Sequence, residues 1–169
     1  MTSMLGYSLR ALTATDRWVL WVMLMHAAHE SSVAAVKANP DLARYASDWH
    51  RAGDMGTVAE VGDLPVGAAW LRVWSKEDRG YGYLADDIPE LAIALLPDYR
   101  GQGIGTALLT SVLHEASKCY PAVSLSIRAD NPALRLYQRF GFRPVAGTDV
   151  INRTGGRSFS MVYACSKDL

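Results

Sequence analysis

A glycine-rich turn between two apolar segments constrains this chain more than any other feature. Residues 100–105 read Arg-Gly-Gln-Gly-Ile-Gly, and they follow the apolar run 91–96. The leucine-rich stretch 106–116 comes next. This order predicts a strand, a tight turn and a helix. Glycines let a backbone approach a ligand closely, and the first turn of a helix has unpaired N–H groups. The segment therefore predicts a phosphate-binding site.

The residues around the glycines decide which phosphate ligand is plausible. A P-loop requires Lys after its last glycine, whereas Thr106 follows Gly105. A dinucleotide fingerprint counted from Gly101 and Gly103 requires glycine or alanine at position 106. The spacing therefore argues against both common nucleotide motifs, and a nucleotide-dependent enzyme is disfavoured.

The turn instead matches an Arg/Gln-x-x-Gly-x-Gly/Ala signature, and a second block downstream supports it. Residues 131–142 read Asn-Pro-Ala-Leu-Arg-Leu-Tyr-Gln-Arg-Phe-Gly-Phe. In both blocks the chain resembles the GNAT superfamily of N-acetyltransferases. The resemblance is specific from Glu90 to Phe142, and upstream only the order of elements supports it. It implies acetyl-CoA as cosubstrate, with its pyrophosphate on the amides of the turn.

Elements before the turn are expected from capping residues and hydrophobic periodicity. We expect a strand at 7–9 and a helix from Thr15 or Asp16 to about His29. Short helices are expected to begin at Ser31-Ser32 and at Asn39-Pro40. Next along the chain we expect a hairpin of strands 57–61 and 66–74, followed by a polar loop at 75–89.

Elements after the turn complete the expected fold. Apolar residues at helical spacing predict a helix over 104–116, and alternation predicts a strand over 123–128 that runs parallel to strand 91–96. Asn131 is expected to cap a helix that has Pro132 in its first position and ends at Gly141. Strands 142–146 and 159–164, with a turn at 155–156, are expected to close the sheet. The expected fold class is α/β (α+β): a mixed, mostly antiparallel sheet with one parallel crossover, flanked by helices, in a single domain of residues 6–165.

Composition excludes several classes of protein. The chain has 169 residues, 17 basic and 17 acidic, so it lacks the overall positive charge of a nucleic-acid or anionic-membrane binder. The longest apolar run, 18–25, is well short of the roughly 20 residues that span a bilayer. Cys119 and Cys165 form no Cys-x-x-Cys pair, and no export signal is recognisable. We expect a cytoplasmic location and no nucleic-acid or membrane partner, and a homodimer is left open.

Two residues are candidates for the chemistry. Tyr137 resembles the family's tyrosine on the helix after the fifth strand, where a phenol protonates the departing thiolate of coenzyme A. Its alternative role is a packed core aromatic. Glu90 is placed to act as a base toward the acceptor amine, as in relatives that use a carboxylate on this strand, often through water. Its alternative is a solvated residue at a strand end.

The expected cofactor-binding residues are carried over from the two matching blocks. Main-chain groups near Leu95 would pair with the pantetheine amides, and Asn131 would hydrogen-bond the same arm or only cap its helix. The loop contributes its amides, with a charge from Arg100. The full set is Leu95, Arg100, Gly101, Gln102, Gly103, Ile104, Gly105, Thr106 and Asn131. No metal is expected, because His26 and His29 have no third ligand at a suitable spacing.

These observations predict an N-acetyltransferase in which a primary amine of a small molecule or peptide attacks acetyl-CoA directly. One alternative is a non-catalytic acyl-CoA-binding module, which needs neither Tyr137 nor a base. Another is an acetyltransferase of protein N-termini or lysines. The acidic and aromatic residues of loop 75–89 suggest a cationic acceptor, and the alternative is an ordinary solvated loop.

Overall fold

The computed structural model describes residues 6–165, and these residues divide into two compact units. The first unit comprises residues 6–72 and 92–112. The second comprises residues 73–91 and 113–165. Two elements contribute to both units, the strand β4 (Glu90–Leu95) and the helix α4 (Ile104–Ala116). That residues 6–165 form one domain stays a prediction.

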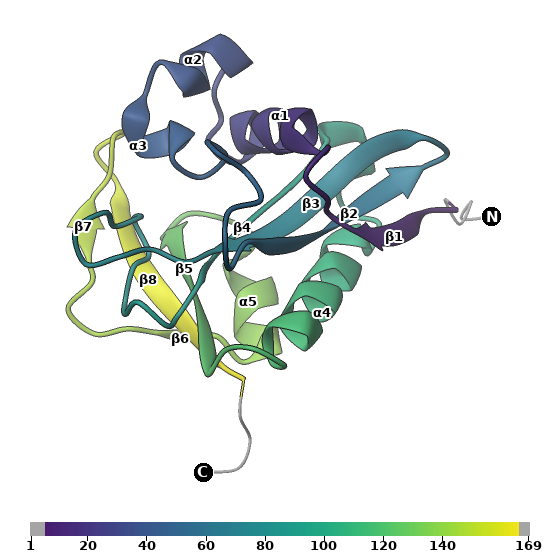
Figure 1. Cartoon of the computed structure of the whole chain (residues 1–169). Coiled ribbons are helices and arrows are strands. Elements are labelled where there is room, and N and C mark those ends of the chain that lie inside the picture. The colour runs from purple at the N-terminus through teal and green to yellow at the C-terminus, as the bar shows by residue number, and fades with distance from the viewer. Residues whose placement is uncertain (1–5, 166–169) are drawn as a thin grey trace. The chain divides into compact units, whose positions relative to one another are not determined.

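The first unit is an antiparallel sheet between helices (Figure 1). Strands β1, β2, β3 and the last residues of β4 are neighbours in that order, and β1–β2 and β2–β3 pair antiparallel. Helix α1 covers one face of these strands, and the first part of α4 covers the other. The remaining elements of this unit are β1 (Ser8–Ala11), α1 (Arg17–Ala27), α2 (Val33–Lys37), α3 (Pro40–Ala43), β2 (Met55–Val61), β3 (Leu64–Arg72) and the 3-10 helix η1 (Pro97–Tyr99).

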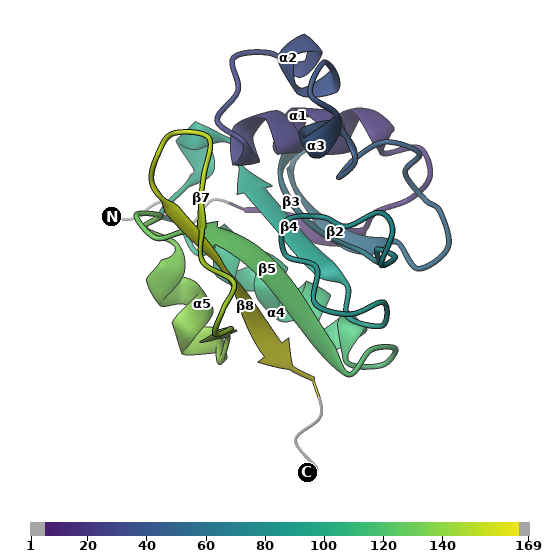
Figure 2. The same cartoon turned by 90° about the vertical axis from the view of Figure 1, so that its left-hand side faces the viewer.

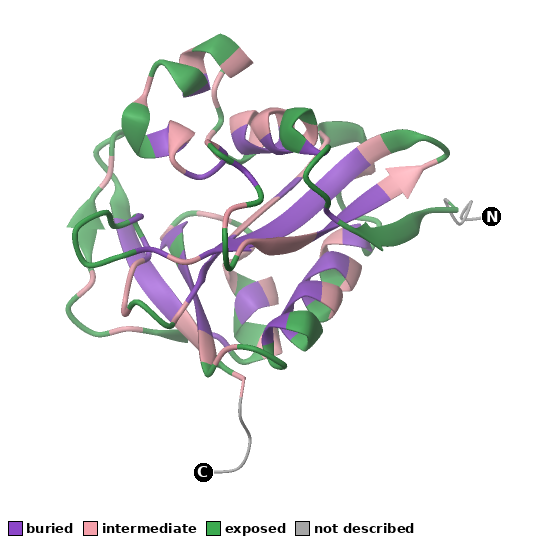
Figure 3. Cartoon of the chain, viewed as in Figure 1, coloured by how far each residue is buried: buried purple, intermediate pink, exposed green. Residues whose placement is uncertain are grey.

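Apolar side chains at helical spacing form the core of the first unit. Leu20 and Met23 of α1 are buried, as are Leu108 and Leu109 of α4. Figure 3 shows the buried residues concentrated along β2 and β3 and on α4. Gly67 of β3 allows close packing, because a Cβ there would lie 3.2 Å from the Leu108 side chain. The apolar residues that recur at helical spacing in α4 are buried, so the prediction of its buried face is confirmed.

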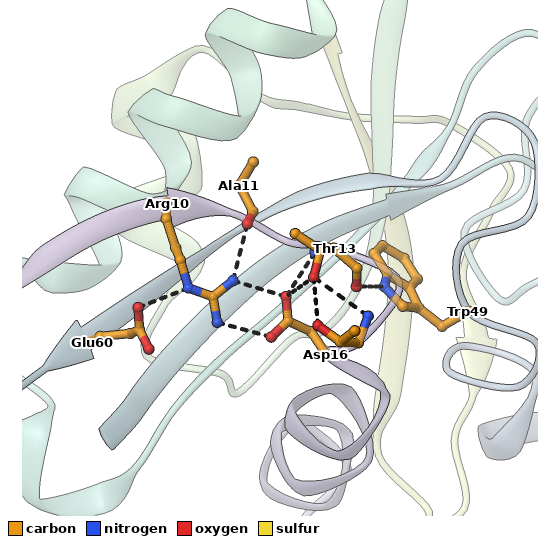
Figure 4. A network of polar contacts seen from close by, with 7 residues as sticks. Arg10, Ala11, Thr13, Asp16, Trp49 and Glu60 are labelled. Atoms are coloured by element: carbon orange, nitrogen blue, oxygen red, sulfur yellow. Dashed lines mark hydrogen bonds and ion pairs between the residues drawn. The ribbon is translucent and has the colours of Figure 1, made fainter. Parts of the chain in front are cut away.

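The start of α1 departs from the expected capping. Asp16 occupies the N-cap position, but its side chain makes no capping hydrogen bond to the helix. Its carboxylate instead accepts two hydrogen bonds from Arg10, at 2.8 and 2.9 Å, and one from the Thr13 amide (Figure 4). The hydrogen bonds from Arg10 are the main reason that the pKa of Asp16 lies below its ordinary value. Glu60 of β2 binds the same guanidinium, so this network ties β1, β2 and α1 together.

A buried arginine fixes the segment that follows α3. The helix predicted from Asn39-Pro40 ends at Ala43, and non-helical turns follow it. Arg72 of β3, only 1% exposed, pairs with Asp54 at 2.8 Å and donates to the carbonyl oxygen of Arg44 at 2.7 Å. The turns of this segment also bond among themselves, since the Ser47 amide donates to the Ala43 carbonyl oxygen at 2.8 Å. The segment is therefore held both by its own turns and by Arg72 of the sheet.

The second unit contains the parallel pair of the fold (Figure 2). Glu90 of β4 pairs with Ser124 of β5 in parallel register, and β5 pairs antiparallel with β8. Strands β6 and β7 also pair antiparallel with β8. The predicted fold class, a mostly antiparallel sheet with one parallel pair and flanking helices, is confirmed. The elements are β5 (Ala122–Arg128), α5 (Leu134–Phe140), β6 (Arg143–Pro144), β7 (Val150–Ile151) and β8 (Arg157–Ala164).

The sequence misplaced the start of α5. The helix begins at Leu134, with Ala133 as its N-cap, so Pro132 precedes the helix. The Asn131 side chain accepts a hydrogen bond from the Ala133 amide at 2.9 Å, in a turn before the helix. An Asn side chain stabilises such a turn as well as it caps a helix, so the residue type did not distinguish them. The end at Gly141, in the left-handed conformation, is confirmed.

Candidate active site

The glycine turn has the conformation that its sequence predicted. Gly101 and Gly103 have φ values of 73° and 84°, in the left-handed region that favours glycine. Both are exposed, and a Cβ on either would meet no atom within 4 Å. Helix α4 starts directly afterwards at Ile104. The turn and the helix N-terminus together form an exposed backbone site of the kind that binds phosphate.

Two side chains of the turn fold back onto the chain before it. Arg100 donates from Nε to the carbonyl oxygen of Leu95 at 3.3 Å, and Gln102 donates to the carbonyl oxygen of Asp98 at 3.1 Å. These bonds bring the two predicted residues Leu95 and Arg100 together. His26 of α1 lies in the field of Arg100: burial first, and then this charge, lower the pKa of His26. No pattern in the sequence predicts that His26 and Arg100 lie near each other.

The end of strand β4, directly before the turn, lies beside strand β3. The Leu96 amide donates to the Val66 carbonyl oxygen at 2.8 Å, so this end of the strand is paired with β3. The Leu95 side chain lies over Gly67, where any Cβ would collide with it. At the start of β4, in the second unit, Glu90 pairs with Ser124 of β5 in parallel register.

Tyr137 is a buried phenol. It is 8% exposed, and its ring meets Phe142 edge-on with centroids 5.7 Å apart. Burial raises the pKa of Tyr137 to about 12, so the phenol keeps its proton at neutral pH. No hydrogen bond to its oxygen occurs within the described residues 6–165. The packing expected of a core aromatic and the protonation expected of an acid are both present.

Glu90 is buried and not a solvated residue at a strand end. Only 3% of it is exposed, and the Trp74 indole donates a hydrogen bond to its Oε1 at 2.9 Å. A buried carboxylate needs such donors, because an isolated charge is costly to remove from water. The solvated alternative considered from the sequence is therefore wrong. The buried position supports a specific role for this side chain.

Two glycines that the sequence analysis passed over pack against Glu90. A Cβ on Gly80 would collide with Oε1 of Glu90 and would lie 2.5 Å from the Trp74 indole. A Cβ on Gly82 would lie 2.9 Å from the Glu90 carboxyl carbon and 2.9 Å from the Leu125 carbonyl carbon. The segment 80–82 therefore closes directly over the carboxylate. The sequence shows two glycines close together in this loop, but no motif connects them with Glu90.

Charged and aromatic side chains of the polar loop 75–89 interact with one another. The Arg79 guanidinium lies 4.9 Å from the centre of the Tyr83 ring, and the Tyr83 hydroxyl donates to Asp86. An internal cation thus already occupies one aromatic face that we expected to attract a cationic acceptor. Asp86 and Asp87 are exposed. Any contribution of this loop to acceptor recognition is therefore expected to be small.

Residues 6–165 contain no group of three His, Cys, Asp or Glu side chains that would hold a metal ion. None of the helices among these residues is both long and apolar enough to cross a bilayer.

Known proteins are similar to this chain in sequence and in fold. The family model for the GNAT acetyltransferase domain matches residues 53–144. The mycothiol acetyltransferase of Brachybacterium faecium is 33% identical over 138 residues, which cover 80% of this chain but only 39% of that enzyme. The chain therefore spans about two fifths of the length of this relative.

Solved structures confirm the fold at low sequence identity. YncA of Salmonella typhimurium, solved with its cofactor acetyl-CoA, superposes with a TM-score of 0.73 at 19% identity, covering 97% of this chain and 96% of that one. The ribosomal-protein-S18-alanine N-acetyltransferase of Escherichia coli gives a TM-score of 0.68 at 20% identity, covering 97% and 99%. Because the family model covers more than half of the residues, this chain belongs to the GNAT acetyltransferase domain family.

Proposed function

We propose that this chain is an acetyl-CoA-dependent N-acetyltransferase in which an amine of a small molecule or peptide attacks the thioester directly. The observation that carries the proposal is the exposed turn with left-handed glycines at the start of α4. Its amides suit the pyrophosphate of coenzyme A, and membership of the family supports this ligand. The solved relative that holds acetyl-CoA supports it further.

The binding residues divide by the chemistry they offer. Backbone N–H groups of residues 101–106 would hold the pyrophosphate, and the charge of Arg100 would add attraction. Main-chain groups near Leu95 would pair with the pantetheine amides in the manner of an added strand. The Asn131 oxygen already accepts a bond from Ala133, so its amide group is the part that would donate to pantetheine.

Tyr137 and Glu90 would handle the protons. The raised pKa of Tyr137 keeps the phenol protonated, so it would give its proton to the thiolate of coenzyme A as the C–S bond breaks. Glu90 would accept a proton from the acceptor amine through water, because segment 80–82 covers its carboxylate. A non-catalytic acyl-CoA module would require neither group. The burial and pairing of Glu90 favour the enzyme.

Thiol release from acetyl-CoA tests the proposal. The protein would be screened with spermidine, glucosamine, free amino acids, and peptides that begin with Ala, Ser or Met, and mass spectrometry would identify the acetylated product. We expect at least one acceptor to yield one thiol per acetyl group transferred. Saturable binding of acetyl-CoA with no turnover on any acceptor would instead identify a binding module. Absence of binding would remove acetyl-CoA as the ligand.

A further inference from the structure

A buried hydroxyl without a partner lies beside Glu90. Ser124 of β5 is 0% exposed, and within residues 6–165 its Oγ has no hydrogen-bond partner. Leaving a buried hydroxyl unpaired costs free energy, so such groups usually mark a bound water, a ligand or a catalytic role. Its position in the sheet decides among these.

The register of the sheet places Ser124 and Glu90 on the same face. The two residues pair directly in the parallel register of β4 and β5. Directly paired residues of adjacent strands project their side chains to the same side of a sheet. Gly82 packs between the Glu90 carboxyl carbon and the backbone of Leu125, on that same side. The hydroxyl and the carboxylate therefore share one covered face.

Trp74 completes this group of polar side chains. Its indole N–H donates to Oε1 of Glu90, which fixes one carboxylate oxygen and the orientation of the group. The indole is itself buried, 4% exposed, and Gly80 packs against it. The cluster of Trp74, Glu90 and Ser124 thus combines an oriented carboxylate with a neighbouring hydroxyl that needs a partner.

We propose that Trp74 and Ser124 are positioning residues for proton removal by Glu90, with the Ser124 hydroxyl holding a water that links the acceptor amine to the carboxylate. This inference rests on the proposed function and names the residues that would make its base effective. A hydroxyl both donates and accepts, so Ser124 orients such a water without changing its own charge. Trp74 keeps the carboxylate in one orientation.

The proton balance is complete with the groups named. The acceptor ammonium gives one proton through the water to Glu90, which becomes a neutral carboxyl group. The neutral amine attacks the thioester carbonyl, the N–C bond forms and the C–S bond breaks. Tyr137 protonates the thiolate, and the second proton of the nitrogen returns to the Tyr137 phenolate. Glu90 then releases its proton to solvent.

Single and double variants of the full chain test the proposal on the fastest acceptor of the screen described above. Ser124→Ala is expected to lower kcat about tenfold, the effect of one hydrogen bond to a charged system, while the KM for acetyl-CoA stays unchanged. Ser126→Ala is the matched control, because Ser126 lies two residues along the same face of β5 but is exposed. It should turn over like the parent.

Coupling and pH dependence separate a relay from a merely structural role. If the two residues act on one path, Ser124→Ala combined with Glu90→Gln should be no slower than Glu90→Gln alone. Trp74→Phe removes a donor to the ionised carboxylate, so the acidic limb of its pH–rate profile should move to higher pH. Ser124→Ala should fold normally, because it only removes an unpaired hydroxyl.

Three results would overturn the proposal that Trp74 and Ser124 position Glu90 and its water. Parental kcat in Ser124→Ala would make the hydroxyl a packing feature, and multiplying losses in the double variant would place the residues on separate paths. An unshifted acidic limb in a folded Trp74→Phe chain would remove Trp74. A parent that releases no thiol with any acceptor would refute the proposed function itself, which is a different outcome from an active parent with an inert Ser124.

Discussion

The glycine turn and the polar cluster around Glu90 are built in opposite ways. The turn is exposed, local in sequence and made of backbone groups, and its glycines have space where side chains would otherwise stand. The cluster is buried, assembled from Trp74, Glu90 and Ser124, and covered by glycines that leave no such space. A backbone site is suited to bind a constant ligand, whereas buried side chains are suited to move protons. Binding and turnover should therefore be separable by substitution.

The largest expected effect is on acetyl-CoA affinity. Gly103→Val places a branched side chain at a φ of 84° and in the open space that the ligand would occupy. We expect the affinity to fall on the order of 10²-fold or more, because several hydrogen bonds to a charged group are lost together. Isothermal titration calorimetry would measure the change.

Gly147→Val is the matched control for this substitution. Gly147 has a φ of 80° and equally open surroundings, but it lies in the turn after β6, away from the glycine turn in sequence. The same backbone strain is thus introduced without obstructing the ligand. Equal losses of affinity in the two variants would show that strain, and not access to the loop amides, controls binding.

The next effect is on turnover alone. Tyr137→Phe keeps the edge-on packing against Phe142 and removes only the phenol proton. The loss in kcat should be on the order of 10²-fold, the lower range for general acid catalysis, with acetyl-CoA affinity retained. Parental turnover in this variant would leave Tyr137 with a packing role only.

Burial of Tyr137 also makes a prediction for stability at alkaline pH. The pKa of Tyr137 is about 12 in the folded chain, and an exposed tyrosine titrates near 10. Between pH 10 and 12 the tyrosine loses its proton in the unfolded chain but keeps it in the folded chain. The free energy of unfolding is therefore unaffected by Tyr137 below pH 10 and falls as the pH rises from 10 toward 12. The loss should reach about 1.4 kcal/mol by pH 11.

Urea unfolding at pH 8 and pH 11 would measure this loss in the parent and in Tyr137→Phe. The variant lacks the titrating phenol, so its stability should fall less between the two values. Other groups, including the Cys165 thiol whose pKa burial also raises, are common to both chains and cancel in the comparison. Equal declines would indicate that the phenol is solvated.

The smallest effect is expected in the exposed loop. Asp86→Asn with Asp87→Asn should raise the KM for a cationic acceptor by only about two- to fivefold, because exposed charges interact weakly and Arg79 already lies over Tyr83. The change should shrink in high salt and spare the KM for acetyl-CoA. Steady-state kinetics at low salt that show equal KM values would remove the loop from acceptor recognition.

The difference between the two regions also explains what the sequence could predict. The turn and the parallel pair follow from local patterns, since glycines at 101 and 103 and the alternation in 123–127 act on adjacent residues. The burial of Glu90 depends on Trp74 and on glycines 80 and 82, which no local pattern links to it. Thr15 or Asp16 was likewise expected to cap α1 from its residue type, but Asp16 binds Arg10 instead, which lies on a separate strand. Local rules predict elements, whereas buried polar pairs require the assembled fold.

Hydrogen–deuterium exchange of the parent, with and without saturating acetyl-CoA, tests the central claim most directly. If the amides of residues 101–106 hold the pyrophosphate, their exchange should slow markedly when the ligand binds, because each bonded N–H is protected. The amides of the turn at 146–149 serve as the internal reference and should be unchanged. Calorimetric saturation with no added protection at 101–106 would contradict the account and place the ligand elsewhere on the chain.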